Sequence, residues 1–200
     1  RARRGVLLGT GGFEANDELR ERFGVPGSAR DTMGVPTNDG RALTAALSAG
    51  ADTDLTDQAW WSPGLTHPDG TSTFSLLVMG GIFVDAHGRR FTNESGPYDR
   101  IGRDALAAMA VGDVTLPFWF VYDDRDGLRP PVGSTSVSMG PSEDYVAAGL
   151  WHTADTLGDL AGRIGVPAEE LELTVARFNA MVESGVDADF GRGEEAYDRA

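Results

Sequence analysis

The sequence of 200 residues contains neither cysteine nor lysine. Without cysteine, the chain forms no disulfide, no thiolate metal site and no cysteine nucleophile. Its three histidines, at positions 67, 87 and 152, have no spacing suited to a metal ion, so a metal site is not expected. The longest apolar run falls far short of the ~18 residues that a membrane-spanning helix needs, which excludes a transmembrane segment of that kind.

Positive charge is also scarce. The 17 basic residues, all arginine, face 31 acidic residues, and the net charge is −14 at pH 7. Such a chain does not bind nucleic acid through its phosphate backbone. No secretory signal precedes the first apolar segment, so the expected compartment is the cytoplasm, with peripheral attachment to the membrane left open. The hydrophobic content of 40% is typical of a globular chain that forms one domain or parts of two.

Two glycine-containing segments lie near the N-terminus. Residues 5–9 read as a short buried strand, and Thr10-Gly11-Gly12 follows it directly. Asn38-Asp39-Gly40 precedes a helical pattern. Glycines after a strand let the backbone approach a ligand closely, although such glycines most often only form a turn. The complete G-x-G-x-x-G dinucleotide fingerprint is absent.

Helical patterns recur along the chain. They predict helices over residues 16–23, 41–50, 100–111, 141–149, 156–164 and 168–184. Asn16 and Asp155 are the expected N-caps of the first and fifth helices. The last helix has an apolar stripe formed by Leu171, Val175, Phe178 and Val182.

Strand patterns are fewer. Residues 76–91 read as a hairpin with Ile82 and Val84 on one face, and residues 116–123 as an apolar, aromatic strand. Residues 51–75 and 186–200 are expected to have little regular structure. The sequence therefore predicts an α+β fold, with a small antiparallel or mixed sheet flanked by helices.

The hairpin leads into a polar loop that ends at Tyr98. A tyrosine fixed by Gly96-Pro97 beside a carboxylate and several arginines is a candidate for proton transfer, and the alternative is a packed surface tyrosine. The neighbouring charges are expected to form a surface ion-pair cluster made of Glu94, Arg89, Arg90, Arg100 and Arg103.

Several of these segments resemble one family. Residues 5–13 and Asn38-Asp39-Gly40 resemble the strand-turn and the Gly-Asp-Gly segment of the fumarate reductase/succinate dehydrogenase flavoproteins, with departures at Gly9 and Asn38. Asp57-Gln58-Ala59-Trp60-Trp61 is similar to a segment of the same group. Residues 80–99, which include Asn93-Glu94-Ser95-Gly96-Pro97-Tyr98, closely resemble the 3-ketosteroid Δ1-dehydrogenases, and residues 185–193 resemble the tail of their catalytic domain.

This resemblance implies a division of the chain. Residues 1–55 would be the C-terminal part of an FAD-binding segment, and residues 56–185 the catalytic, or capping, domain. Residues 186–200 would be a hinge returning toward the FAD-binding part. The family's pyrophosphate fingerprint and second FAD-binding segment are absent from these residues, so the resemblance implies an internal fragment that is inactive and holds no FAD when isolated.

The implied reaction is the desaturation of the C1–C2 bond of a 3-ketosteroid, with a hydride passing to FAD, a proton to Tyr98, and electrons on to an external acceptor. The implied cofactor-binding residues are Thr10, Gly11, Gly12, Asp39 and Gly40. The implied substrate-binding residues are Trp60, Trp61, Phe118 and Trp119, each of which is as well explained as a core residue. Asn93 and Glu94 are assigned to holding the loop.

Two other functions remain open. A fumarate-reductase-like ene-reductase would use an arginine as its proton donor, and Tyr98 after Pro97 favours the ketosteroid group, including desaturases that act at another position. The other function is that of a non-catalytic, ligand-binding domain.

Overall fold

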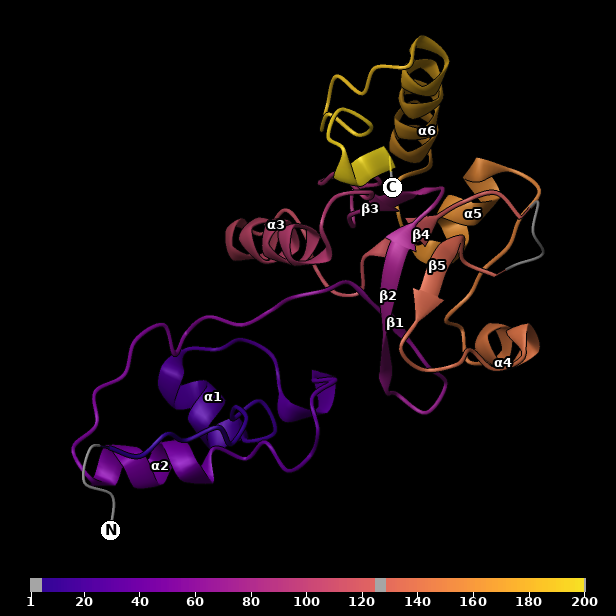
Figure 1. The fold of residues 1–200 in the computed structure, drawn as a ribbon. Helices are drawn as coiled ribbons and strands as arrows, with labels where there is room; N and C mark the ends of the chain where they lie inside the picture. The colour runs from indigo at the N-terminus through magenta and orange to yellow at the C-terminus, as the bar shows by residue number, and fades with distance from the viewer. Residues whose placement is uncertain (1–4, 125–128, 200) are drawn as a thin grey trace. The chain divides into compact units, whose positions relative to one another are not determined.

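The computed structural model describes residues 5–124 and 129–199, and the chain divides into two compact units, Arg1–Trp60 and Trp61–Ala200 (Figure 1). The first unit contains α1 (Asp17–Phe23), the 3-10 helix η1 (Ala29–Asp31) and α2 (Arg41–Ser48). The Asn16 side chain accepts a hydrogen bond from the Leu19 N–H and caps α1, and Gly24 ends the helix in the left-handed conformation, as predicted.

The predicted strand over residues 5–9 is wrong. These residues are irregular and exposed, and Leu7 keeps 95% of its surface. No other strand lies among residues 5–60, so this segment has no neighbour to pair its N–H and C=O groups or to cover its apolar side chains. Strand propensity alone does not form a strand without such a partner.

The second unit contains two small antiparallel sheets. One has the strand order β1-β2-β5, formed by Gly64–Thr66, Ser72–Val78 and Val132–Thr135. The other pairs β3 (Ile82–Val84) with β4 (Trp119–Val121), with Ile82 opposite Val121. With the surrounding helices, these sheets confirm the α+β class.

Residues 51–75 are more regular than predicted, because they hold β1 and the start of β2. The strand was missed because its inward positions are polar: Thr73 and Ser75 are buried. The Thr73 hydroxyl donates to the Val137 carbonyl at 3.2 Å, and the Ser75 hydroxyl to the Pro63 carbonyl at 3.3 Å. Hydroxyls satisfied in this way are buried at little cost, but they leave no hydrophobic alternation to read.

The hairpin after β3 is reduced to a tight turn and a single bridge between Val84 and Arg90. As predicted, Ile82 and Val84 share a face: both lie in a hydrophobic cluster with Leu171. Phe83 points into a second cluster with Ile101. The strand is buried on both faces and forms the centre of this unit.

Four α-helices surround these strands in the described part of the second unit: α3 (Tyr98–Val111), α4 (Ser142–Ala147), α5 (Leu157–Ile164) and α6 (Ala168–Ser184). A short 3-10 helix, η2 (Tyr197–Arg199), interrupts the otherwise irregular tail.

Three details of these helices differ from prediction. Tyr98 begins α3 and does not end a loop. Thr156 caps α5 in place of Asp155, because its hydroxyl accepts the Asp159 N–H. Val182 is exposed and Met181 buried, because the inward face of α6 shifts by one residue near its end.

Candidate cofactor and proton-transfer sites

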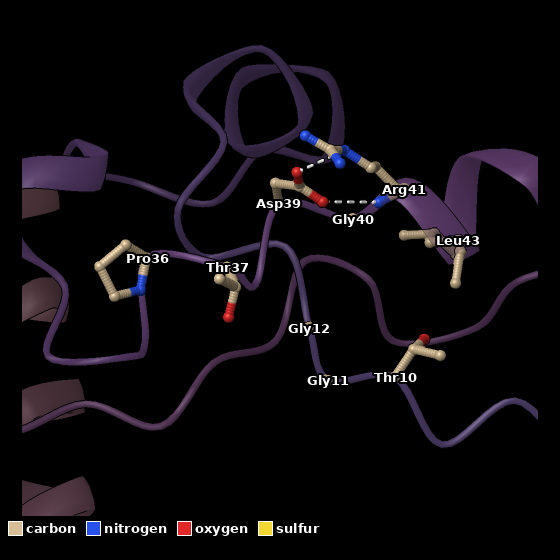
Figure 2. A pocket seen from close by; sticks show the side chains of 10 residues that line it. Thr10, Gly11, Gly12, Pro36, Thr37, Asp39, Gly40, Arg41 and Leu43 are labelled. Atoms are coloured by element: carbon tan, nitrogen blue, oxygen red, sulfur yellow. Dashed lines mark hydrogen bonds and ion pairs between the residues drawn. The ribbon is translucent and has the colours of Figure 1, made fainter.

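The first unit contains a cavity of about 390 Å³ at the start of α2 (Figure 2). The five residues predicted to bind a cofactor all line it: Thr10, Gly11, Gly12, Asp39 and Gly40. Pro36, Thr37, Arg41, Ala42 and Leu43 complete the wall. The structure thus brings together two segments that lie almost thirty positions apart in the sequence.

Asn16 and Gly40 set the position of this wall. The Asn16 side chain, which caps α1, also donates to the Asp39 carbonyl at 2.8 Å. Gly40 has a φ of +76° and lies against the side chains of Leu19 and Phe13, which leave no space for a Cβ. A residue with a side chain would be strained here, so glycine at this position is required by conformation and by packing.

The polar groups of the cavity suit a ligand with hydroxyl and phosphate groups. The Asp39 carboxylate accepts the Arg41 N–H at 3.2 Å and pairs with the Arg41 guanidinium at 2.7 Å (Figure 2). The N-cap residue Gly40 has no side chain to cap α2, so beyond Arg41 the N–H groups of its first turn and the positive end of its dipole are available to an anionic or polar group. Thr10 and Thr37 add hydroxyl groups to the lining of the same cavity. These donors fit a flavin dinucleotide.

Tyr98 lies in the second unit, half-buried at the first position of α3. Its ring meets Phe74 of β2 edge-on, with 4.8 Å between the ring centroids. The next residue, Asp99, accepts the Trp61 N–H at 2.9 Å and the Arg103 guanidinium at 2.8 Å. The start of α3 is therefore held by contacts that do not involve the Tyr98 hydroxyl.

The four predicted substrate-binding residues are dispersed. Trp61 packs on α3 at Gly102, where a Cβ would stand 2.9 Å from the Trp61 carbonyl carbon. Trp60 keeps 83% of its surface and belongs to the first unit. Phe118 packs in the cluster of Phe83, and Trp119 packs against the cluster of Ile82 and Val84. The structure therefore places Trp61 beside the helix of Tyr98 and gives Phe118 and Trp119 a place in the core.

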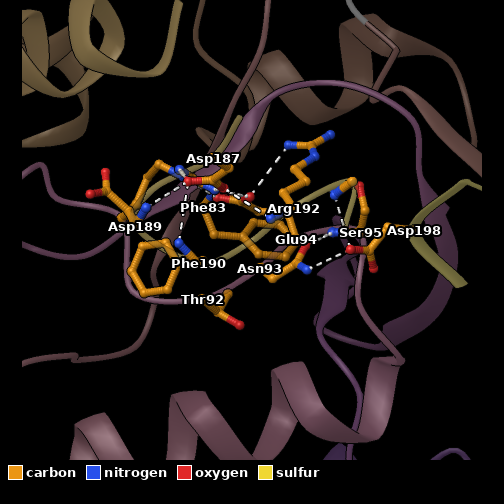
Figure 3. A network of polar contacts seen from close by, with 12 residues as sticks. Phe83, Thr92, Asn93, Glu94, Ser95, Asp187, Asp189, Phe190, Arg192 and Asp198 are labelled. Atoms are coloured by element: carbon orange, nitrogen blue, oxygen red, sulfur yellow. Dashed lines mark hydrogen bonds and ion pairs between the residues drawn. The ribbon is translucent and has the colours of Figure 1, made fainter. Parts of the chain in front are cut away.

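The second unit contains a buried charge network, formed by Arg90, Glu94, Asp187 and Arg192. Figure 3 shows the last three of these side chains. Arg90 donates to both Glu94 oxygens, at 2.9 and 2.8 Å, and to both Asp187 oxygens, at 3.2 and 2.8 Å. Arg192 contacts Glu94 at 3.3 Å and donates to the Gly81 carbonyl at 2.7 Å. The Arg90 and Glu94 side chains are 3% and 0% exposed, so the prediction of a surface cluster is wrong for this pair.

The other arginines of that cluster are exposed, as predicted. They pair with carboxylates from Arg89 to Glu170, from Arg100 to Glu195 and from Arg103 to Asp99. Exposed pairs of this kind are screened by water and contribute little to stability.

The network connects the segment after α6, which contains Asp187 and Arg192, to the loop before Tyr98, which contains Arg90 and Glu94. Asp187 also accepts the N–H groups of Asp189 and Phe190, at 3.0 and 3.2 Å. Burial alone would raise the pKa of Asp187, but its hydrogen bonds from Arg90 and from this backbone outweigh burial and lower the pKa to about 2. Burial likewise opposes the charge of Arg90, whose hydrogen bonds to the two carboxylates keep its pKa above the ordinary value.

Asp187 should therefore give the protein an acid-sensitive stability. Because its folded pKa lies near 2 and its ordinary pKa near 3.8, its contribution is complete above about pH 4 and is lost as the pH falls to about 2. The loss should be about 2 kcal/mol. In urea unfolding between pH 4.5 and 2, Asp187→Asn should show a shallower pH dependence than the native protein, whereas exposed Asp155→Asn should not. Equal slopes in all three proteins would contradict the assignment.

The sequence did not indicate Asp187 as a partner of Arg90, or Arg192 as a partner of Glu94. The one signal for them was the resemblance of residues 185–193 to a family tail, which marked the segment without saying what it contacts. Asn93 holds the loop as assigned, since its side chain donates to Asp198 at 3.0 Å.

A family model described as an FAD binding domain matches residues 1–200. The chain belongs to this FAD-binding family. Within the family, it is 39% identical to the 3-oxosteroid 1-dehydrogenase of Mycobacterium tuberculosis (strain ATCC 25618 / H37Rv), over all of this chain and 37% of that protein. It is also 39% identical to the 4-oxocyclohexanecarboxylate 2-dehydrogenase of Sinomonas cyclohexanicum, over 97% of this chain and 34% of that protein.

A solved structure supports the same relationship. It is the 3-ketosteroid delta1-dehydrogenase from Sterolibacterium denitrificans, in complex with 1,4-androstadiene-3,17-dione. The superposition covers 99% of this chain, with a TM-score of 0.82 and 32% sequence identity. This chain spans 37% of that structure and about a third of the length of the curated relatives. Within residues 5–124 and 129–199, no helix has the length and apolarity to cross a membrane, and no cluster of acidic and histidine side chains could hold a metal ion.

Proposed function

We propose that these residues belong to an FAD-dependent dehydrogenase that introduces a C1–C2 double bond into 3-ketosteroids. The observation that carries the proposal is the agreement over 99% of the chain, with a TM-score of 0.82, with a 3-ketosteroid delta1-dehydrogenase. In this proposal residues 1–55 contribute to FAD binding, residues 56–185 form the capping domain over the substrate, and residues 186–200 return toward the FAD-binding part.

Thr10, Gly11, Gly12, Asp39 and Gly40 would hold part of FAD. The free N–H groups at the start of α2 suit a phosphate or carbonyl oxygen, and the Asp39 carboxylate suits a sugar hydroxyl. Bound FAD would supply the hydride-accepting chemistry. The chain's own residues orient the steroid and take up the proton.

Tyr98 would take the proton from the carbon next to the C3 carbonyl. This hydrogen is the more acidic of the two that the reaction removes. An ordinary tyrosine has a pKa near ~10, so a phenolate at neutral pH needs a stabilising environment. The nearest cations in the sequence are Arg100 and Arg103, and both already bind carboxylates, Glu195 and Asp99.

The proposal is tested with the complete polypeptide that carries these residues. We expect it to purify with near-stoichiometric flavin absorbance and to reduce an electron-accepting dye in the presence of 4-androstene-3,17-dione. We expect no reduction of fumarate when a reduced dye is supplied as the electron donor. Absence of flavin would contradict the cofactor assignment. Fumarate reduction without steroid oxidation would contradict the reaction.

A second candidate substrate has its own support. The relative from Sinomonas cyclohexanicum is as similar as the steroid enzyme, and its name describes a dehydrogenase of a single-ring ketone, 4-oxocyclohexanecarboxylate. Comparing kcat/KM for this compound and for the steroid separates the two, because a cleft built for four fused rings gains most of its binding from apolar surface that the smaller ketone lacks.

A further inference from the structure

Asn38 is the point at which this chain departs from the Gly-Asp-Gly pattern of the flavoproteins it resembles. Its side-chain N–H donates to Oε1 of Glu14 at 2.5 Å, across 24 positions of sequence. Both side chains are half-buried. Because the acceptor is a carboxylate, this bond belongs to the stronger, charge-assisted class of hydrogen bonds.

The two side chains lie against the glycines of the cavity segments. A Cβ on Gly11 would stand 2.9 Å from Cγ of Asn38, and one on Gly12 would stand 2.5 Å from Oε2 of Glu14. A Cβ on Gly34 would stand 2.6 Å from Cγ of Glu14. Glycine at these three positions therefore leaves the space that the side chains of Glu14 and Asn38 occupy.

The pair joins the two walls of the cavity. One wall is Thr10-Gly11-Gly12, and the other runs from Pro36 to Leu43. The backbone of Asn38 is fixed separately, because its carbonyl accepts the Ala15 N–H at 3.1 Å and its N–H donates to the Val35 carbonyl at 3.0 Å. Its side chain is therefore not needed to hold this backbone and can act, with Glu14, as a spacer between the walls.

We propose that Glu14 and Asn38 form a positioning pair that sets the separation of the two walls of the FAD site. The proposal rests on the proposed function, since it assigns FAD to this cavity. The pair works because one member carries a donor and the other only acceptors. Neither residue needs to touch the cofactor.

Exchanging the donor and the acceptor tests this directly. Asn38→Asp is nearly isosteric but places a second carboxylate beside Glu14, so at pH 7.5 the walls should separate and the Kd for FAD should rise at least about tenfold. At pH 5 the two carboxylates can share a proton, and most of the loss should be recovered. The other nearby charges are constant across these variants: Arg20 donates to the backbone carbonyls of Glu14, at 3.5 Å, and of Pro26, and Asp39 is paired with Arg41.

The double variant E14Q/N38D restores one donor and one acceptor in reversed order. Its Kd for FAD should return to within about threefold of the native value and lose the pH dependence. Glu14→Gln alone keeps an acceptor for Asn38 and should change the Kd by less than about threefold. Asn179→Asp, on the exposed face of α6, adds the same charge far from the pair in sequence and serves as the matched control.

The measurement is quenching of FAD fluorescence on titration with the deflavinated complete polypeptide, with thermal unfolding to confirm that each variant folds. A native Kd in Asn38→Asp would overturn the positioning pair, and so would a folded double variant that fails to recover. Failure of the native protein to bind FAD would instead refute the cofactor assignment, and the positioning role with it.

Discussion

If the complete protein is the proposed steroid dehydrogenase, replacing Tyr98 by phenylalanine is expected to slow the reaction by a factor of about 10²–10⁴, the range typical of a lost acid–base group. The substitution removes only the hydroxyl. The ring can keep its edge-on contact with Phe74, and the first turn of α3 stays fixed to Trp61 through Asp99. The flavin content and the unfolding temperature should therefore be those of the native protein.

The direct measurement is the rate at which excess steroid reduces the bound flavin in a single turnover, because this step contains the proton transfer and excludes reoxidation. Tyr197→Phe is the matched control: it removes a hydroxyl from a tyrosine that is 42% exposed in the tail. We expect the control to react at the native rate. A Tyr98→Phe rate within about threefold of native would remove Tyr98 from proton transfer, whatever the steady-state activity.

The local elements of this fold could be predicted because their signals are local. α1 begins after Asn16, whose side chain caps it, and ends at Gly24, which has the left-handed conformation. Both signals depend on residue type within one turn. The residues that line the cavity were indicated by the resemblance of residues 5–13 and 38–40 to flavoprotein segments, since glycines after a strand-like run most often only form a turn. Sequence alone could not show that the two segments face one another.

The buried charge network could not be predicted for the opposite reason. Arg90 and Asp187 are 97 positions apart, and nothing in the neighbourhood of either residue indicates burial. Charged residues are mostly exposed, so the surface assignment of Glu94 followed the general trend that this pair breaks. Residues 5–9 show the converse: an apolar run predicts burial, yet a strand needs partners that its own sequence does not specify.

Replacing Arg90 by methionine should have the largest effect on stability, about 3–5 kcal/mol of the free energy of unfolding. It leaves Glu94 and Asp187 buried, with Arg192 as the one remaining cation of the network. It also removes a guanidinium that lies 4.8 Å from the ring centroid of Phe178 and 5.0 Å from that of Phe190. Urea unfolding followed by tryptophan fluorescence measures the loss.

The neighbouring residue supplies the control for this prediction. Arg89 pairs with Glu170 at 2.9 Å, but its side chain is 63% exposed and the pair is screened by water, so Arg89→Met should cost much less stability than Arg90→Met. Adding Glu94→Gln to Arg90→Met should recover part of the loss, because it neutralises one of the two carboxylates left without their main partner. If Arg90→Met were no more costly than Arg89→Met, the network would not hold the tail against the Tyr98 loop. If the double variant were less stable than the single one, unpaired charge would not be the cause of the loss.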